Sequence, residues 1–121
     1  SVLPVERKEN VIIERALEYM QNRIFEKLSL SDVASYVERD PSYFVRLFKS
    51  WMNITPMQYY ANLQLEAARA LLANTNLSVK EVAARLHYCS EFHFSKQFKR
   101  STQLSPTAYR LRYRQKLGPF N

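Results

Sequence analysis

The sequence has very little glycine: Gly118 is the only one among its 121 residues. Glycine supplies the positive φ angles of tight hairpin turns and lets a backbone approach bound phosphates closely, so its scarcity argues against hairpin-rich folds and phosphate-binding loops. The abundant residues are good helix formers, namely Leu, Ala, Arg, Lys, Glu and Gln. Hydrophobic residues make up 46% of the chain, which is enough for a packed core and argues against disorder. The composition therefore predicts a folded, all-α protein.

Cysteine and long apolar runs are also scarce. Cys89 is the single cysteine, so no internal disulfide can form and a reducing compartment is expected. No stretch reaches the roughly 18 consecutive apolar residues of a membrane span, and the opening segment SVLPVERKEN lacks the apolar part of a secretory signal. We therefore expect a cytoplasmic protein without a membrane partner.

Acidic residues become rare after residue 40. Residues 1–40 carry six basic and eight acidic side chains, whereas residues 41–121 carry twelve basic and three acidic ones, a net charge of +9. The overall charge of +7 is thus unevenly distributed along the chain. An arginine-rich basic segment indicates a polyanionic partner. Nucleic acid is the favoured partner and an anionic membrane surface the second choice, because the arginine side chain binds phosphates and base edges well.

Apolar residues recur at helical spacing in four segments before residue 77. A first helix is predicted within residues 10–25 from one apolar stripe, formed by Ile13, Leu17, Met20 and Ile24. Three more helices are predicted over residues 31–37, 40–52 and 56–73. Their starts carry Ser, Asp or Thr side chains that can cap free backbone N–H groups, and two of them also carry proline. The predicted buried positions are Phe44, Leu47, Phe48 and Trp51 in the third helix and Tyr60, Leu63, Ala67 and Leu71 in the fourth.

The same pattern then occurs a second time. LSLSDVA (28–34) and LSVKEVA (77–83) align without a gap at an offset of 49 residues. FVRLFK (44–49) and FSKQFK (94–99) align at an offset of 50, so the second copy has one more residue between its helices. The segments that follow the second helix of each copy, ITPMQYY and LSPTAYR, also align, and Pro56 matches Pro106. An internal repeat of this kind indicates a duplicated structural unit.

Each copy is predicted to form a short helix, a tight turn and a second helix with a polar, basic outer face. This is a helix-turn-helix arrangement, in which the second helix enters the DNA major groove while the first crosses the backbone. The outer-face positions of the second helix are Ser42, Val45, Arg46 and Lys49 in the first copy and Phe92, Ser95, Lys96 and Lys99 in the second.

These segments resemble the arabinose-regulator (AraC/XylS) family of bacterial transcription factors. The resemblance covers roughly residues 10–114 and rests on PSYFVRLFK, on ITPMQYYANLQLEAARALLANTNLSVKEVAARLHY and on FHFSKQFKRSTQLSPTAYR. It implies two helix-turn-helix subdomains joined by a long linker helix, about seven helices in all. The family usually has glycine in both turns and after each recognition helix, where this chain has Glu38, His87, Asn53 and Gln103. It often has arginine at the place of Gln64.

The resemblance also implies a domain organisation and partners. The expected segments are an N-terminal linker (1–9), a first subdomain (10–53), a linker helix (54–76), a second subdomain (77–114) and a C-terminal tail (115–121). Family members usually carry a separate sensing or dimerisation domain, so this chain is expected to be a C-terminal fragment. Its expected partners are double-stranded DNA, RNA polymerase and that further domain.

The expected function is sequence-specific binding of double-stranded DNA in transcription regulation, with two recognition helices in successive major grooves. The side chains expected to contact bases are Ser42, Val45, Arg46, Glu91, Phe92, Ser95 and Lys96. Those expected to contact phosphates are Ser29, Ser31, Lys49, Ser78, Lys99, Arg100, Arg110 and Arg112. Phosphate contacts position a protein on DNA, whereas base contacts give it sequence preference.

Some alternatives stay open from the sequence. Phe92 can pack against a neighbouring helix or touch a thymine methyl group, and the run YRLRYRQK (109–116) can be a solvated helix end or a source of phosphate contacts. The residues His87, Cys89, Glu91 and His93 lie close together, but their spacing matches no zinc pattern, so neither a metal nor another cofactor is expected.

Catalysis is not expected either, because the chain has no phosphate loop, nucleophile motif or pair of carboxylates in apolar surroundings. The alternative function is a helical protein-interaction module, an adaptor to polymerase or to another regulator. Such a module would explain the amphipathic helices but not the duplicated basic face.

Overall fold

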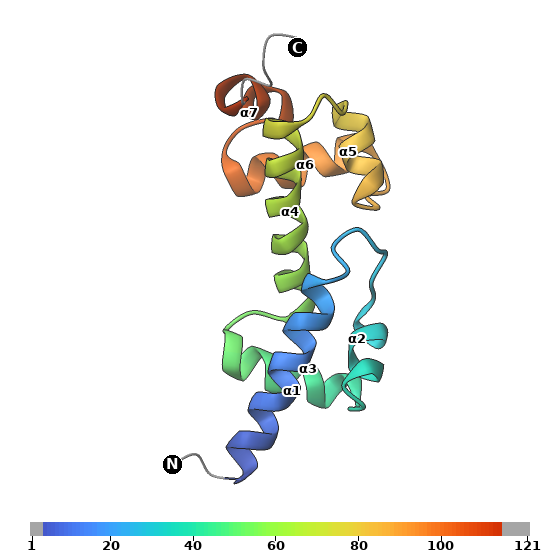
Figure 1. Ribbon diagram of the computed structural model, residues 1–121, viewed down its shortest axis with the longest axis vertical. Helices are drawn as coiled ribbons and strands as arrows, with labels where there is room; N and C mark the ends of the chain where they lie inside the picture. The colour runs from blue at the N-terminus through green and yellow to red at the C-terminus, as the bar shows by residue number, and fades with distance from the viewer. Residues whose placement is uncertain (1–3, 115–121) are drawn as a thin grey trace. The chain divides into compact units, whose positions relative to one another are not determined.

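The computed structural model describes residues 4–114, and this part of the chain is all-α, with seven helices and no strand (Figure 1). The helices are α1 (Pro4–Gln21), α2 (Leu30–Tyr36), α3 (Pro41–Met52), α4 (Pro56–Asn74), α5 (Val79–Arg85), α6 (Glu91–Thr102) and α7 (Pro106–Tyr113). The predicted fold class is confirmed. None of the helices in the described range is long and apolar enough to cross a membrane. The tail expected at residues 115–121 lies outside the described residues.

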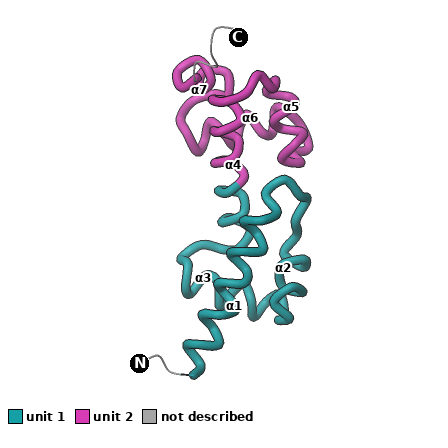
Figure 2. Tube along the Cα trace, in the orientation of Figure 1, with its two compact units in different colours: residues 1–63 teal, residues 64–121 magenta. Residues whose placement is uncertain are grey.

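The helices form two compact units, which Figure 2 shows in different colours. Unit 1 comprises residues 1–63 and unit 2 comprises residues 64–121, so α4 contributes its first turns to unit 1 and the rest to unit 2. In unit 1, α1 packs against α2 and α3, and α2 packs against α3. In unit 2, α5 and α7 both pack against α6. Each unit therefore holds one complete copy of the repeat.

Unit 1 has a core to which all four of its helices contribute. The buried side chains are Ile12, Ile13, Ala16 and Met20 from α1, Val33 and Ala34 from α2, Val37, Phe44, Leu47 and Phe48 from the turn and α3, and Tyr60 from α4. The Phe48 ring meets those of Phe44 and Tyr59 edge-on, with centroids 5.8 Å apart in both pairs. Such edge-to-face contacts add to the hydrophobic stabilisation of the core.

Unit 2 repeats this core. Its buried side chains are Leu65, Ala68 and Leu72 from α4, Val82, Ala83 and Leu86 from α5 and its end, and Phe94 and Phe98 from α6. Phe98 lies 5.7 Å from Phe94 and 5.3 Å from Tyr109 between ring centroids. The Phe98–Tyr109 contact corresponds, 50 residues later, to the Phe48–Tyr59 contact of unit 1. Helices α3 and α6, the second helices of the two helix-turn-helix units and their expected recognition helices, are thus fixed to their units by the same aromatic packing.

The first helix lies earlier in the sequence than predicted. It was expected within residues 10–25, but α1 begins at Pro4 and ends at Gln21, so Ile24 is not part of its buried stripe. The chain turns after Gln21 because the Tyr60 hydroxyl, from α4, lies 2.6 Å from the carbonyl oxygen of Arg23 and 2.5 Å from that of Glu26. This contact is between segments far apart in the sequence, so local periodicity could not reveal it.

Two predicted buried stripes also need correction. Trp51 was expected in the core, but it is 40% exposed and its indole N–H donates to the Glu9 carboxylate at 3.1 Å. In α4 the predicted stripe through Leu63, Ala67 and Leu71 is displaced by one residue. The side chains buried at a spacing of four are Tyr60, Gln64, Ala68 and Leu72. The apolar pattern was misleading because a polar residue, Gln64, occupies a buried position.

The matched cores predict how stability responds to truncation. Phe48→Ala and Phe98→Ala should each lower the free energy of unfolding by about 3–5 kcal/mol, because both rings are fully buried and their removal leaves a cavity. Phe92→Ala is the matched control, since the same residue type is 78% exposed on α6 and its loss should change stability by less than about 0.5 kcal/mol. Urea unfolding followed by circular dichroism measures all three. A comparable loss for Phe92→Ala would contradict this account of the core.

Candidate nucleic-acid interface

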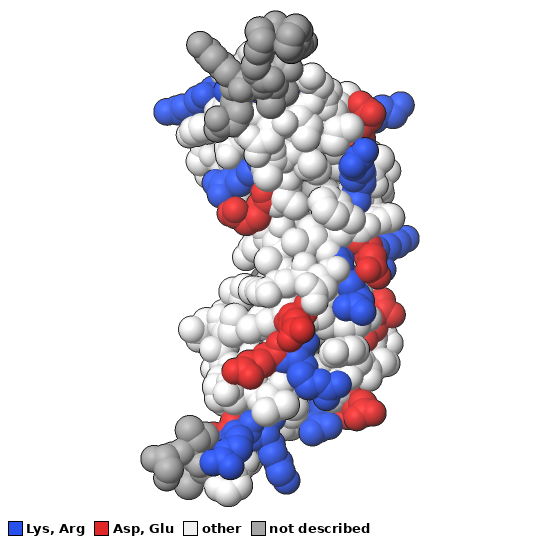
Figure 3. Space-filling model, in the orientation of Figure 1, with Lys and Arg blue, Asp and Glu red and all other residues white. Residues whose placement is uncertain are grey.

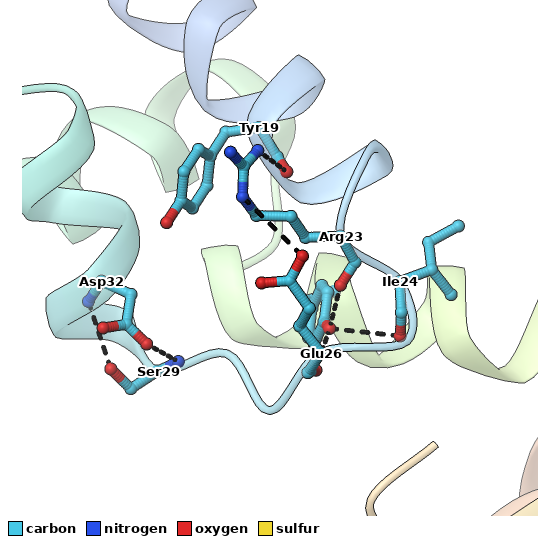
Figure 4. Close-up of polar contacts among 7 residues, drawn as sticks. Tyr19, Arg23, Ile24, Glu26, Ser29 and Asp32 are labelled. Atoms are coloured by element: carbon cyan, nitrogen blue, oxygen red, sulfur yellow. Dashed lines mark hydrogen bonds and ion pairs between the residues drawn. The ribbon is translucent and has the colours of Figure 1, made fainter. Parts of the chain in front are cut away.

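The short first helix of each helix-turn-helix begins with a capping box. Ser29 Oγ accepts from the Asp32 backbone N–H at 3.1 Å, and the Asp32 carboxylate accepts from the Ser29 N–H at 2.9 Å (Figure 4). Ser78 and Glu81 repeat both bonds, at 3.0 and 2.9 Å. The hydrogen bond from the backbone N–H of the capping serine is the main reason why the pKa values of Asp32 and Glu81 are lowered. Ser29 is therefore the cap of α2, and Ser31 is an exposed residue of its first turn.

The tight turn of each copy needs one residue in the left-handed conformation. Glu38 (φ 57°) and His87 (φ 61°) occupy these positions, which glycine would adopt with less strain. The residue that follows donates its backbone N–H back to the short helix: Arg39 to the Ala34 carbonyl and Tyr88 to that of Ala83, both at 3.0 Å. The two turns therefore close in the same way, although neither contains glycine.

The recognition helices α3 and α6 begin and end at matching positions. The side chains of Asp40 and Ser90 accept from the backbone N–H three residues later, at 3.1 and 3.0 Å. Asn53 (φ 66°) and Gln103 (φ 69°) end the helices in the left-handed conformation, and each donates its N–H to the carbonyl four residues earlier at 2.8 Å. These caps fix the length of each recognition helix and hence which side chains form its outer face.

Burial on α3 and α6 follows the same pattern except at one position, where Leu47 is buried and Gln97 is half-buried. The phenylalanines at 44 and 48, and at 94 and 98, point into the cores. The expected interface residues on the other faces are exposed: Ser42, Arg46 and Lys49 on α3, and Glu91, Phe92, Lys96, Lys99 and Arg100 on α6. Val45 and Ser95 are half-buried at matching positions. Each unit thus gathers its expected base-contacting residues on one recognition helix, and the 78% exposure of Phe92 argues against its packing on a neighbouring helix.

Arg110 lies apart from this face and is engaged internally. Its Nε donates to the Leu72 carbonyl at 2.9 Å, and a second guanidinium nitrogen donates to the Leu77 carbonyl. Burial, and secondarily the charge of Arg114, lowers the pKa of this guanidinium. Arg110 therefore ties the end of α4 to the start of α5, whereas Arg112 is exposed, with its guanidinium 5.6 Å from the Tyr113 ring.

Two supports of the helix-turn-helix units were missed in the sequence. Gln64 is buried, and its Nε2 donates to the Leu86 carbonyl at 3.2 Å, which holds the end of α5 against α4. The second support is a stack on unit 1 between α1 and α2: the Tyr19 and Tyr36 rings lie 4.2 Å apart, and the Arg23 guanidinium lies 3.9 Å from the Tyr19 ring. Figure 4 shows Arg23 between Tyr19 and Glu26, whose carboxylate is 4.0 Å away. The spacing of four residues between Arg15, Tyr19 and Arg23 in the sequence was the available signal.

The site offers hydrogen-bond donors and positive charge. Within residues 4–114, no group of three or more His, Cys, Asp or Glu side chains could hold a metal ion. Two short helices, each leading through a tight turn to an anchored helix with an exposed polar face, define a protein with tandem helix-turn-helix units.

Comparison with known proteins agrees with this class. A family model described as a helix-turn-helix domain matches residues 33–112. The regulatory protein PocR of Salmonella typhimurium is 33% identical over 98 residues, which cover 81% of this chain and 32% of PocR. The solved structure of a transcriptional regulator from Chromobacterium violaceum, described as an AraC-type DNA-binding domain-containing protein, is similar to this chain with a TM-score of 0.81 at 29% identity. The similarity covers 91% of this chain and 96% of that chain.

A further solved structure similar to this chain is the DNA-binding domain of AdpA, a global transcriptional factor, in complex with a target DNA. Its TM-score is 0.78 at 26% identity, with 84% of this chain and 91% of that chain covered. The chain belongs to the AraC/XylS family of helix-turn-helix transcription regulators. It spans about a third of the length of the curated relatives that it matches.

The capping boxes predict a pH dependence of stability. The pKa values of Asp32 and Glu81 are lower in the folded protein than in the unfolded chain. The two carboxylates therefore contribute fully to folding stability above their unfolded-state pKa values, and this stability is lost as pH falls through their folded-state pKa values. The double variant Asp32→Asn, Glu81→Gln should therefore lose less stability than the wild type between about pH 5 and pH 2. Thermal unfolding at several pH values measures this difference.

The matched control for this experiment is Glu14→Gln, Glu18→Gln, which removes two exposed carboxylates of α1 that lie outside both capping boxes. Its acid dependence should follow the wild type more closely than the capping-box variant does. Parallel curves for the capping-box variant and the wild type would contradict the role assigned to the two carboxylates.

Proposed function

We propose that this chain binds double-stranded DNA in a sequence-specific manner as part of a transcription regulator, with α3 and α6 in successive major grooves. The observation that carries the proposal is the duplicated recognition helix, anchored by buried phenylalanines and exposing a polar, basic face in both units. The similarity to a DNA-binding domain that was solved on its target DNA supports it. An adaptor module would need no second copy of this face, and the relatives are regulators rather than enzymes.

Base contacts are assigned to the exposed face of each recognition helix. Arg46 lies in the middle of α3, where its guanidinium can donate two hydrogen bonds to O6 and N7 of a guanine. Phe92 has no polar group, so its exposed ring suits the methyl group of a thymine. The remaining residues assigned to base contacts are Ser42, Val45, Glu91, Ser95 and Lys96.

Phosphate contacts are assigned to side chains around these faces. Lys49, Lys99, Arg100 and Arg112 are exposed cations. The hydroxyl groups of Ser29 and Ser78 accept a hydrogen bond inside the capping boxes, but each still has its own proton to donate to a phosphate oxygen. Ser31 is exposed beside Ser29. Arg110 is omitted, because its guanidinium already donates to two backbone carbonyls.

The wider setting is part of the same proposal. RNA polymerase and a sensing or dimerisation domain are the further partners that we expect for the whole regulator, in the cytoplasm. The similarity covers only about a third of the length of these relatives, which supports a larger regulator of which the tandem helix-turn-helix is one part.

Salt dependence tests the proposed binding most directly. If the four assigned cations displace counterions from phosphates, the affinity for a duplex selected from a random library should fall by about two orders of magnitude between about 50 and 200 mM salt. This selected duplex and a scrambled duplex of equal length are titrated by fluorescence anisotropy, and the selected one should bind more tightly. Absence of binding to either duplex at the lowest salt would refute the proposed function.

A pair of substitutions separates base contacts from phosphate contacts. Arg46→Ala should cost roughly 1–3 kcal/mol on the selected duplex and relax the preference at one base pair, because the guanidinium contacts a base edge. Lys99→Ala should weaken binding to the selected and scrambled duplexes to a similar degree, because phosphates are present in both. Both variants are titrated against both duplexes. Equal losses on the two duplexes for Arg46→Ala would show that this residue does not read a base.

A further inference from the structure

The two units carry very different net charges. Residues 1–63 have eight basic and eight acidic side chains and are neutral, whereas residues 64–121 have ten basic and three acidic ones and carry the whole net charge of +7. On the face drawn in Figure 3, acidic side chains lie beside basic ones over both units, so the contrast is one of net charge. Since attraction to phosphates depends on net positive charge, the two units are not electrostatically equivalent.

Part of the difference lies in the helix-turn-helix elements themselves: residues 30–52 are neutral, whereas residues 79–102 have a net charge of +3. In unit 1, the left-handed turn residue is Glu38 and the cap of the recognition helix is Asp40, and both are exposed. In unit 2 the corresponding residues are His87 and Ser90, and the turn contains no carboxylate. The short first helix repeats the contrast: α2 has no basic residue, while α5 carries Lys80 and Arg85.

The two carboxylates of the unit 1 turn, Glu38 and Asp40, take part in no ion pair within residues 4–114. Among the described residues, the ion pairs are Arg23–Glu26 and Arg69–Glu66, neither of which includes Glu38 or Asp40. Arg39 supplies one positive charge between them, and its guanidinium donates to the carbonyls of Val37 and Glu38. The segment of residues 38–40 therefore has a net charge of −1.

Asp40 also offsets the partial positive charge at the start of α3. A helix N-terminus attracts phosphate because its backbone N–H groups are free and its dipole is positive there. In α3 that end already holds the Asp40 carboxylate, which accepts from the Tyr43 N–H at 3.1 Å. In α6 the capping group is the neutral hydroxyl of Ser90, which accepts from the His93 N–H at 3.0 Å, and the carboxylate at this helix start is Glu91, in the first turn rather than at the cap. The N-terminal part of a recognition helix is the part that approaches the bases and the flanking phosphates.

We propose that Glu38 and Asp40 keep unit 1 off DNA that lacks its sequence, so that unit 2 alone holds such DNA and unit 1 engages only at a matching site. This inference rests on the proposed function. On DNA without a site, binding depends on attraction to phosphates, which unit 2 supplies. Unit 1 joins only where short-range contacts by side chains such as Arg46 outweigh the repulsion from its turn.

The repeat provides a matched pair of lysines for the test. Lys49 and Lys99 occupy the same position of α3 and α6, and both are exposed. On a scrambled duplex, Lys99→Ala in the full chain should lower the affinity about five- to tenfold at about 0.1 M salt and reduce the salt slope by about 0.9. Lys49→Ala should change that affinity by less than about twofold, because unit 1 is not engaged there.

Removal of the two carboxylates should bring unit 1 onto the scrambled duplex. In the double variant Glu38→Gln, Asp40→Asn, the affinity for this duplex should rise about three- to tenfold, and Lys49→Ala should now weaken it as Lys99→Ala does. Asparagine is a good helix cap, so α3 is preserved. If the double variant does not fold, Asp40→Ser, which copies Ser90, tests the same effect with one charge.

The control is Glu14→Gln, Glu18→Gln, which changes the net charge by the same amount on α1, away from the turn. In this background Lys49→Ala should remain without effect on the scrambled duplex. The inference is overturned if Lys49→Ala and Lys99→Ala weaken that duplex equally in the wild type, or if both double variants act alike. Absence of any duplex binding by the wild type would instead refute the proposed function.

Discussion

The contact on which each half of this protein depends is the burial of the inner face of a recognition helix. Phe48 packs edge-on against Tyr59, and Phe98 packs against Tyr109 in the same way. Both phenylalanines are fully buried, so each helix can lie on its unit in one rotational setting only. That setting determines which side chains form the outer face. The positions available for contact with DNA are therefore a consequence of core packing.

The duplication extends beyond the helix-turn-helix units to the helices that follow them. Tyr60 and Arg110 occupy matching positions 50 residues apart, and both hold the segment that leads into the short helix of their unit. Tyr60 does so with a hydroxyl at the Arg23 and Glu26 carbonyls, and Arg110 with a guanidinium at the Leu72 and Leu77 carbonyls. The chemistry differs while the role is the same. Helix α4 ends one copy of this arrangement and begins the next, which explains why a single long helix belongs to both units.

The two units are similar in packing but differ in charge. The two recognition helices share cap positions, length and buried phenylalanines, yet the turn that precedes α3 carries two carboxylates and the turn that precedes α6 carries none. Side chains on an exposed turn do not affect the core, so they can change without loss of the fold. A duplicated scaffold can in this way support two units with different affinities for phosphate. The electrostatic difference follows from the exposed residues and the structural likeness from the buried ones.

The sequence by itself determined the all-α class, the duplicated unit and the ends of α3, because caps, prolines and apolar spacing are local signals. The resemblance to the family added the positions where glycine is usual, and Glu38, Asn53, His87 and Gln103 have positive φ there. Only the tertiary structure decided the end of α1, the burial of Gln64, the exposure of Trp51 and the internal role of Arg110. Each of these depends on a partner that lies 22 to 42 residues away in the chain or on packing between helices. Local periodicity carries no information about such partners, since a polar side chain is buried only where another segment supplies its hydrogen bond.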